Sequence, residues 1–449
     1  MTGNTIAVTL GILLLGLLLT SLWVRLPRIT LLDCFLLSIA LFFGAYTVID
    51  AMAVDSQQTD GLAVATVFFL IAASAMVFWF FARKPSPLLK RTSLLRLQLD
   101  WQACPAWPII GLISLAVLYR WYTAAYFSEY GPLDATALEA LDQNLPYWYT
   151  SLGMVVTVGL YPAALCSWGK VRASTGLRRF FWAAMLAASA MMIMGLGRRS
   201  MLAFLVIIGW DLLTNTRIQR HRWMAFALLV LSVPLFITIS NLYQAYRGSS
   251  VRGVPLENIT SDVTPESFLE GATDLNRTMA NLQEREAIWR HNYEVVKAHL
   301  DGRGDLQWGR LFVASIPNLV PAALYPGKTI FDTQGELIEA FNLENTDKSE
   351  NIFANTYADF GMLSAIAAPL MILLIVWVCA VAMRHFRDPF LRVLLMGTAI
   401  FYAMNLESSY VVPLGFARDF VVIALAYLAI RTVVRLGWHE LRTIGQLQA

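Results

Sequence analysis

Residues 5–24 read TIAVTLGILLLGLLLTSLWV, a stretch without a charged side chain. A run of about 20 apolar residues is long enough for a helix to cross a bilayer, whereas barrel strands would alternate apolar and polar positions. Similar runs recur along the chain, which is 57% hydrophobic and 14% charged, with a mean hydropathy of +0.56. These values lie outside the range of soluble globular domains. The sequence therefore predicts an all-α fold, a polytopic transmembrane helical bundle.

The apolar runs divide the chain into three segments. We expect about eight helices in residues 1–240, a polar loop over residues 241–359 and about three helices in residues 360–449, about eleven in all. After the first run, the candidate spans lie near residues 30–52, 62–82, 105–125, 146–168, 180–197, 201–215, 223–242, 360–383, 391–408 and 416–435.

The short connections between these runs alternate between basic and nearly base-free. The basic side carries Arg25 and Arg28; Arg83, Lys84, Lys90, Arg91 and Arg96; Lys170, Arg172, Arg178 and Arg179; Arg217, Arg220 and Arg222; Arg384, Arg387 and Arg392; and Arg431, Arg435 and Arg442. Cytoplasmic loops are enriched in Lys and Arg, so this side is predicted to be cytoplasmic. The N-terminus and the loop at 241–359 then lie outside, and the C-terminus lies inside.

Four arginines fall on the predicted outer side, where this rule disfavours them. They are Arg120, Arg198, Arg199 and Arg418. One interpretation is that they reach lipid headgroups at the membrane surface. The other is that they line a polar cavity, because costly charges near a membrane tend to mark substrate sites. Arg198 and Arg199 follow a glycine turn between two apolar runs, and two guanidinium groups there are suited to a bidentate grip on a phosphate or pyrophosphate.

The loop at 241–359 is the one long polar stretch of the chain. Apolar residues recur near helical spacing over 264–300, which predicts one or two amphipathic helices lying over the bundle. IPNLVPAALYPGKT, at 316–329, then breaks regular structure and returns the chain toward the membrane. Arginines in this loop can bind a lipid phosphate, and aromatic faces can stack on sugar rings; the aromatic candidates are Trp289, Tyr293, Trp308 and Tyr325.

Metal and nucleotide motifs are absent from the sequence. PGKT lacks the upstream glycine of a phosphate loop, and no H-E-x-x-H or G-x-S-x-G element occurs. His291 and His299 lack a third ligand, so a packing or solvated role is the stronger interpretation for them. The four cysteines, Cys34, Cys104, Cys166 and Cys379, fall in or beside apolar runs, where packing is expected rather than a disulfide framework.

An ordered set of local patterns over residues 190–425 resembles the Wzy-type polysaccharide polymerases and, more broadly, their relatives the O-antigen ligases. GLGRRSMLAF opens an apolar helix, NLYQAYRG leaves one, and the long outer loop follows. The loop ends in IPNLVPAALYPGKT, ENIFANTYADFGMLSAI leads into a helix, and a late arginine stands in FARDFVV. Residues before this range match the family only in hydropathy.

The resemblance implies a bacterial inner-membrane glycosyltransferase that works on the periplasmic face. Its donor would be a glycan chain on undecaprenyl pyrophosphate, and its acceptor a single repeat unit on the same lipid. It also implies a chain-length regulator of the Wzz type and a flippase as partners, and neither a nucleic acid nor a cofactor. An already activated leaving group requires neither metal nor nucleotide.

The expected site residues follow from this chemistry. Cations would stabilise the departing pyrophosphate, a role assigned to Arg198, Arg199, Arg247 and Arg418, with Arg252 and Lys328 as second choices. A carboxylate or histidine would take the proton of the acceptor hydroxyl. The candidates for this base are Glu350 and Asp359, which are favoured, together with Asp332 and His291.

Two other functions stay open. An O-antigen ligase would use the same donor but transfer the glycan to lipid A core, with His291 or His299 as its outer-loop histidine. A non-enzymatic flippase of lipid-linked oligosaccharides would carry charges through the middle of the bundle and show two similar halves. The LYPGKT segment and the downstream ADFG favour the polymerase.

Overall fold

The computed structural model describes residues 3–25, 30–45, 47–48, 60–83, 104–128, 147–172, 178–196, 288–320, 325, 332–343, 351–403, 406 and 411–447. These residues form helices and short connections, and no strand occurs among them. The predicted all-α class is therefore confirmed for this part of the chain. The number of membrane crossings and the side of the membrane on which the loop lies remain predictions.

The helices up to residue 196 belong to the predicted N-terminal segment. They are α1 (Gly3–Arg25), α2 (Leu31–Ser38), the π-helix η2 (Ile39–Ala45), α4 (Gly61–Arg83), α5 (Ala106–Ser128), α7 (Tyr147–Arg172) and α8 (Arg178–Leu196). The later helices are α14 (Ile288–Leu300), α15 (Arg310–Ser315), the 3₁₀ helix η6 (Ile316–Leu319), α16 (Thr333–Phe341), α17 (Ile352–Phe360), the 3₁₀ helix η7 (Gly361–Leu363), α18 (Ser364–His385), α19 (Pro389–Ala403) and α20 (Val411–Leu447).

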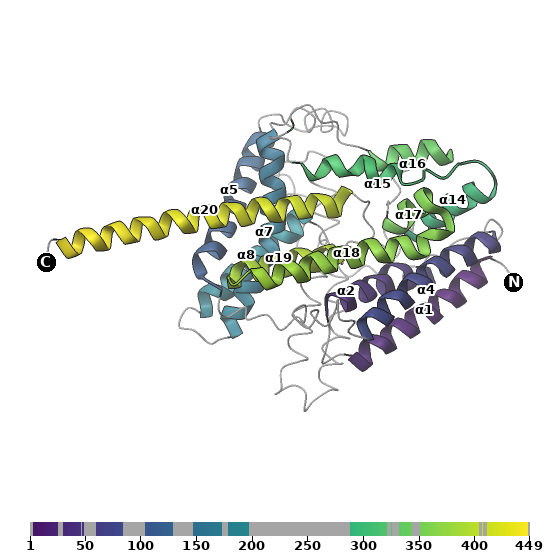
Figure 1. Cartoon of the computed structure of the whole chain (residues 1–449), viewed down its shortest axis with the longest axis horizontal. Coiled ribbons are helices and arrows are strands. Elements are labelled where there is room, and N and C mark those ends of the chain that lie inside the picture. Colours follow the sequence, from purple (N-terminus) through teal and green to yellow (C-terminus); the bar gives the residue numbers. More distant parts are fainter. Residues whose placement is uncertain are drawn as a thin grey trace, which may run out of the picture.

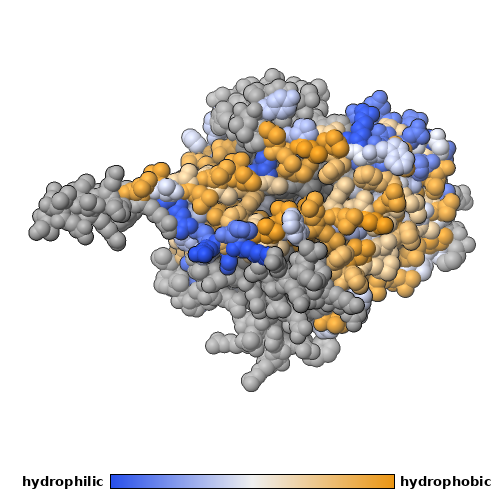
Figure 2. Space-filling model, viewed as in Figure 1, coloured by the Kyte–Doolittle hydropathy of each residue, from blue (hydrophilic) through white to orange (hydrophobic). Residues whose placement is uncertain are grey.

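Three of the described helical stretches are long and apolar enough to cross a membrane: Asn4–Val24, Gly61–Phe81 and Ile352–His385. Large apolar side chains stay exposed along them, among them Leu13, Phe69 and Leu370. Figure 2 shows this hydrophobic surface extending across the bundle, with hydrophilic residues gathered at its margins. An apolar surface of this extent is typical of a protein that lies in lipid.

The second apolar run does not form one regular helix. Thr30 and Asp33 form a capping box that starts α2, in which Asp33 accepts from the Thr30 N–H at 2.7 Å. The helix widens into η2 after Ser38. Gly44 of η2 lies so close to α1 that a Cβ there would come within 3.3 Å of the Leu15 Cβ. The missing side chain thus permits the close packing of η2 on α1.

The helices pack into two adjoining groups. In the first, α4 contacts both α1 and α18; in the second, α7 contacts α5, α8 and α19. Aromatic rings join them: Phe35 of α2 stacks on Phe78 of α4 at 6.2 Å and meets the Tyr402 ring of α19 edge-on at 5.9 Å. The core is therefore continuous across both groups.

The two ends of the bundle carry different structures. A helix of the length of α18 spans about 33 Å at 1.5 Å per residue. Figure 1 shows α14, α16 and α17 at the end of the molecule nearer the N-terminus, whereas α20 projects at the opposite end. The described helices of the loop and the C-terminal end of α20 therefore lie at opposite ends of the molecule. The side of the membrane on which each end lies remains a prediction.

Candidate functional site

Helix α14 connects the loop region to the bundle. It contacts α4 and η2 of the bundle as well as α16 and α17 of the loop region. The Tyr293 hydroxyl oxygen accepts a hydrogen bond from the Asp60 N–H at 3.0 Å, at the start of α4. The predicted amphipathic helices over 264–300 are thus represented by α14, while residues 264–287 lie outside the described part. Instead of lying on the bundle surface, α14 is buried between bundle and loop.

His291 lies on α14 and is only 1% exposed. Its neighbours in sequence, Trp289, Asn292 and Tyr293, are buried too. A role as general base stays a prediction for His291, and in this structure an acceptor hydroxyl has no open path to it. His299, the last residue but one of α14, donates from Nδ1 to the Gly304 carbonyl oxygen at 3.2 Å and meets the Tyr357 ring edge-on.

The turn after α14 is hydrogen-bonded to α17, and Trp308 at its end has a left-handed backbone conformation. The Gln307 N–H donates to the Ala358 carbonyl oxygen of α17 at 2.8 Å, which fixes the loop to that helix. Trp308 follows with φ 51° and is 74% exposed. A left-handed backbone is strained for a residue other than glycine. Trp308 is therefore held at the surface at some cost in stability.

Asp359 is fully buried at the end of α17 and caps α15. Its Oδ1 accepts from the Leu311 N–H and its Oδ2 from the Phe312 N–H, both at 3.1 Å. The first N–H groups of a helix lack partners within the helix, and a carboxylate there also meets the positive end of the helix dipole. This arrangement is what a structural cap requires. Asp359 as catalytic base stays a prediction.

Asp332 has a similar local role at the start of α16. Its side chain accepts from the Gln334 N–H at 3.1 Å, which makes it the N-cap of the helix. One turn later, Glu336 forms an exposed ion pair with Arg310 at 2.9 Å. Pairs of this kind contribute little to stability in solvent. Asp332 thus caps α16, and the exposed Arg310–Glu336 pair links α15 to α16 with little effect on stability.

Arg418 joins the bundle to the loop. It lies on α20, where its Nε donates to Asp419 Oδ1 at 2.8 Å, and its Nη1 donates to the Asn318 carbonyl oxygen at 3.4 Å. Asn318 belongs to η6, directly before the PAALYPGKT stretch. Its side-chain nitrogen is buried and has no hydrogen-bond partner in the described ranges. A bundle arginine and a loop amide 100 residues apart in sequence therefore meet at one seam.

Most of the other predicted site residues lie outside the described residues. These are Arg198, Arg199, Arg247, Arg252, Lys328 and Glu350. Of the predicted set, the described residues bring Arg418 to the loop through Asn318 and bring Asp359 to α15. The sequence did not predict a role for Asn318, because that role depends on its contact with Arg418 of α20 and no local sequence pattern indicates this contact.

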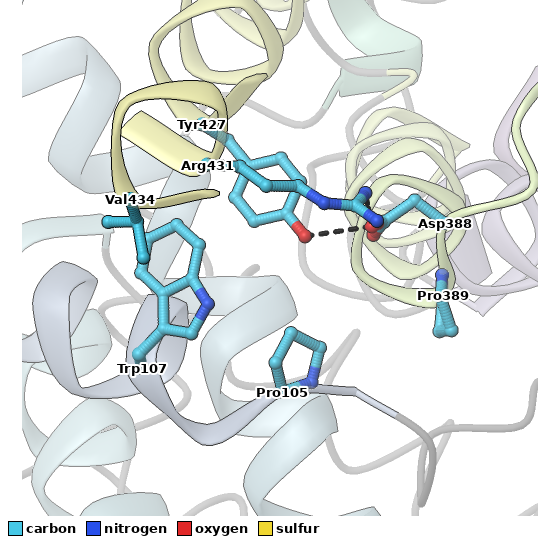
Figure 3. A pocket seen from close by; sticks show the side chains of 7 residues that line it. All are labelled: Pro105, Trp107, Asp388, Pro389, Tyr427, Arg431 and Val434. Carbon is cyan, nitrogen blue, oxygen red and sulfur yellow. Dashed lines mark hydrogen bonds and ion pairs between the residues drawn. The ribbon is translucent and has the colours of Figure 1, made fainter. Parts of the chain in front are cut away.

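The opposite end of the bundle contains a different polar junction, which sequence reasoning also missed. Asp388, between α18 and α19, accepts from the Phe390 N–H at 2.9 Å and from the Leu391 N–H at 3.3 Å through Oδ1. Its Oδ2 accepts from the Tyr427 hydroxyl at 2.8 Å and pairs with Arg431. Figure 3 shows both side chains of α20 directed at Asp388. A cavity of about 330 Å³ beside them is lined by Pro105, Trp107, Asp388, Pro389, Tyr427, Arg431 and Val434.

No group of three or more His, Cys, Asp or Glu side chains in the described ranges could hold a metal ion. Cys34, Cys104, Cys166 and Cys379 are free thiols, all buried. This agrees with the packing role that the sequence predicts for them.

The described fold defines a class, a helical protein with three stretches suited to membrane crossing and a helical loop region at one end of the bundle. No protein-family model, curated protein or solved structure matches the chain.

Proposed function

We propose that the chain is an inner-membrane glycosyltransferase that polymerises undecaprenyl-pyrophosphate-linked oligosaccharide repeat units on the periplasmic face. The acceptor's sugar hydroxyl oxygen forms a bond to the anomeric carbon of the donor glycan. The bond between that carbon and the pyrophosphate oxygen breaks, and undecaprenyl pyrophosphate leaves. The glycan chain grows at its reducing end by one repeat unit in each cycle.

The observation that carries this proposal is the seam between α20 and η6. Arg418 is the predicted late arginine of the bundle, and its guanidinium contacts the Asn318 carbonyl oxygen, at the beginning of the proline-rich segment. The Asn318 side-chain nitrogen supplies a second hydrogen-bond donor there, without a partner among the described residues. Guanidinium and amide N–H groups are donors that suit an anionic group such as pyrophosphate.

The seam also supplies the preorganisation that such chemistry requires. Asp419 fixes the Arg418 guanidinium at 2.8 Å, and both side chains are shielded from solvent for the most part. Donors that are oriented before the reaction stabilise developing charge without reorganisation. Negative charge grows on the pyrophosphate as its bond to the sugar breaks. Arg418 acts there together with Arg198, Arg199 and Arg247, with Arg252 and Lys328 as further cations.

For the general base we propose Glu350. The alternative Asp359 is fully buried, and each of its oxygens accepts a backbone N–H of α15. A substrate hydroxyl has no open path to Asp359 in this structure, because the side chain is fully buried. His291 is 1% exposed and could act as the base only if α14 moved away from the bundle. Glu350 stands directly before Asn351, the N-cap of α17, where the loop returns to the bundle.

The reaction is independent of metal ions and nucleotides in this proposal. The lipid pyrophosphate is an activated leaving group, so that no further phosphorylation of the sugar is required. The cationic side chains named above provide the electrostatic stabilisation that a divalent ion gives in other glycosyl transfers.

Purified protein incubated with undecaprenyl-pyrophosphate repeat units tests the proposal. The units can be isolated from cells in which the gene has been deleted, where they are expected to accumulate. We expect a ladder of longer lipid-linked chains and the release of undecaprenyl pyrophosphate. Glycan products that appear only after lipid A core is added would identify a ligase instead. Transport of intact units across a vesicle membrane without new glycosidic bonds would identify a flippase.

A further inference from the structure

One side of α14 combines an aromatic pair with buried polar atoms that lack partners. The rings of Trp289 and Tyr293 lie 6.0 Å apart. Asn292 stands between them in sequence, and residues three or four positions apart share one side of a helix. Trp289 is 2% exposed and Asn292 4% exposed. All three side chains therefore share a buried side of the helix.

The polar atoms on this side have no hydrogen-bond partner in the part of the chain that the structure describes. They are the indole nitrogen of Trp289 and both the Nδ2 and the Oδ1 of Asn292. An unpaired buried donor or acceptor costs about 1–3 kcal/mol, so such atoms are rare in native proteins and require an explanation. Three such atoms on adjacent turns of one helix could form hydrogen bonds to a polar molecule.

We infer that Trp289 and Asn292 bind a sugar ring of the lipid-linked oligosaccharide, an assignment that rests on the proposed function. The amide of Asn292 offers both a donor and an acceptor, which matches a sugar hydroxyl, since a hydroxyl group also donates and accepts. The indole N–H of Trp289 supplies a second donor. The aromatic faces beside them suit the apolar face of a sugar ring. Neither Trp289 nor Asn292 carries a charge, so this part of the site suits the neutral glycan. The arginines bind the pyrophosphate.

The sugar enters only when α14 moves away from the bundle. The bond from the Asp60 N–H to the Tyr293 hydroxyl holds α14 at the start of α4 in this structure. This hydrogen bond contributes about 1 kcal/mol. Because α14 also packs on α4 and α17, with Trp289, Val295 and Val296 buried, binding of the sugar must offset the loss of those contacts as well.

Replacement of Asn292 by leucine separates this role from a structural one. Leucine has a similar shape but no polar atoms, so Asn292→Leu removes the unpaired groups and leaves the packing. We expect the unfolding midpoint of the purified protein to stay equal or rise. We expect affinity for lipid-linked oligosaccharide to fall about tenfold or more, because the sugar hydroxyl loses its hydrogen bonds to the Asn292 amide. Trp289→Phe, which removes only the indole N–H, should weaken affinity in the same direction.

The binding measurement uses two probes, lipid-linked oligosaccharide from the deletion strain and undecaprenyl pyrophosphate without sugar. Asn292→Leu should lose affinity for the first and keep wild-type affinity for the second. Ser74→Ala in α4 is the matched control, since it also removes a buried polar atom that lacks a partner among the described residues. It should bind both probes as the wild type does.

The outcomes distinguish the two proposals. Equal affinity of wild type and Asn292→Leu for the oligosaccharide probe overturns the sugar contact and leaves the proposed function standing. A markedly lower unfolding midpoint of Asn292→Leu also overturns it, because Asn292 would then have a structural partner. Wild-type protein that binds neither probe overturns the proposed function, and the sugar contact with it.

Discussion

The Asp388 junction and the buried side of α14 both connect segments far apart in the sequence, but they treat their polar groups in opposite ways. At Asp388, each carboxylate oxygen receives two donors, from the start of α19 and from Tyr427 and Arg431 of α20 (Figure 3). At Asn292, neither the donor nor the acceptor of the amide has a partner among the described residues. A buried polar network that is fully satisfied fixes a structure, whereas an unsatisfied one leaves binding capacity for another molecule.

The cavity beside Asp388 shows the same difference from the buried side of α14. Pro105, Trp107 and Val434 line it with apolar surface, and its carboxylate has no acceptor capacity left. The Trp107 ring stacks on Tyr427 at 5.1 Å, which adds packing to the hydrogen bonds. This junction therefore ties α5, α19 and α20 together at the end of the bundle opposite the proposed site.

The largest effect is expected at the seam between bundle and loop. Arg418→Gln keeps much of the shape of the side chain but removes its charge, so polymerisation should fall about 10²–10³-fold, as for other preorganised donors. The chain-length ladder of purified protein measures it. Arg310→Gln is the matched control, because Arg310 is 63% exposed and pairs only with Glu336 in the described part of the chain. Similar activity in the two variants would remove Arg418 from the site.

The next largest effect is expected on stability at Asp388. Asp388→Ala leaves Arg431 unpaired and uncaps α19, which should lower the free energy of unfolding by about 3 kcal/mol. Activity per folded molecule should not change. Denaturation of the single variants and of the double variant Asp388→Ala/Arg431→Ala measures the coupling. A double variant that loses the full sum of both single effects would show that the pair does not act as a unit.

A smaller effect on stability is expected at Asp359. Asp359→Ala removes the cap of α15 and should cost about 1–2 kcal/mol, while activity per folded molecule stays within a few-fold of the wild type. Glu350→Gln should behave in the opposite way, with little change in stability and a large loss of turnover. If Asp359→Asn abolished turnover at an unchanged unfolding midpoint, Asp359 and not Glu350 would be the base.

The smallest effect is expected at Trp308. Its backbone φ of 51° is strained for tryptophan and easy for glycine, and its exposed ring makes few contacts. Trp308→Gly should therefore stabilise the protein by up to about 1 kcal/mol. Thermal unfolding measures the change, with Trp308→Ala as the control that keeps the strain. A destabilised glycine variant would mean that the ring contributes packing that outweighs the strain.

The helical class and many helix positions could be predicted from the sequence, because a membrane requires long uninterrupted apolar runs. The predicted runs at 62–82 and 105–125 correspond to Gly61–Arg83 and Ala106–Ser128. The run at 30–52 does not predict where its helix changes form, because hydropathy does not distinguish one regular α-helix from α2 followed by the π-helix η2. The close packing of Gly44 on α1 that accompanies this change depends on tertiary contacts.

The candidate site was less predictable, because its features arise from pairs of residues distant in sequence. FARDFVV identified Arg418, but nothing local to it indicates Asn318, 100 residues earlier. The place of Asp359 at the return of the loop predicts a residue near the membrane surface. It does not predict that Asp359 accepts the N–H groups of residues 311 and 312, 48 and 47 positions earlier. The apolar positions of α14 predicted a helix but not that Asn292 would be buried with them.

The ratio of undecaprenyl pyrophosphate released to glycosidic bonds formed tests the central claim most directly. Purified wild-type protein is incubated with lipid-linked repeat units, and both products are counted over the same time course. We predict one undecaprenyl pyrophosphate for each new glycosidic bond, with both rates lowered together in Arg418→Gln. Two results would contradict polymerisation at this site. One is that the lipid-linked repeat units release undecaprenyl pyrophosphate without new glycosidic bonds, and the other is that glycosidic bonds form without release of undecaprenyl pyrophosphate.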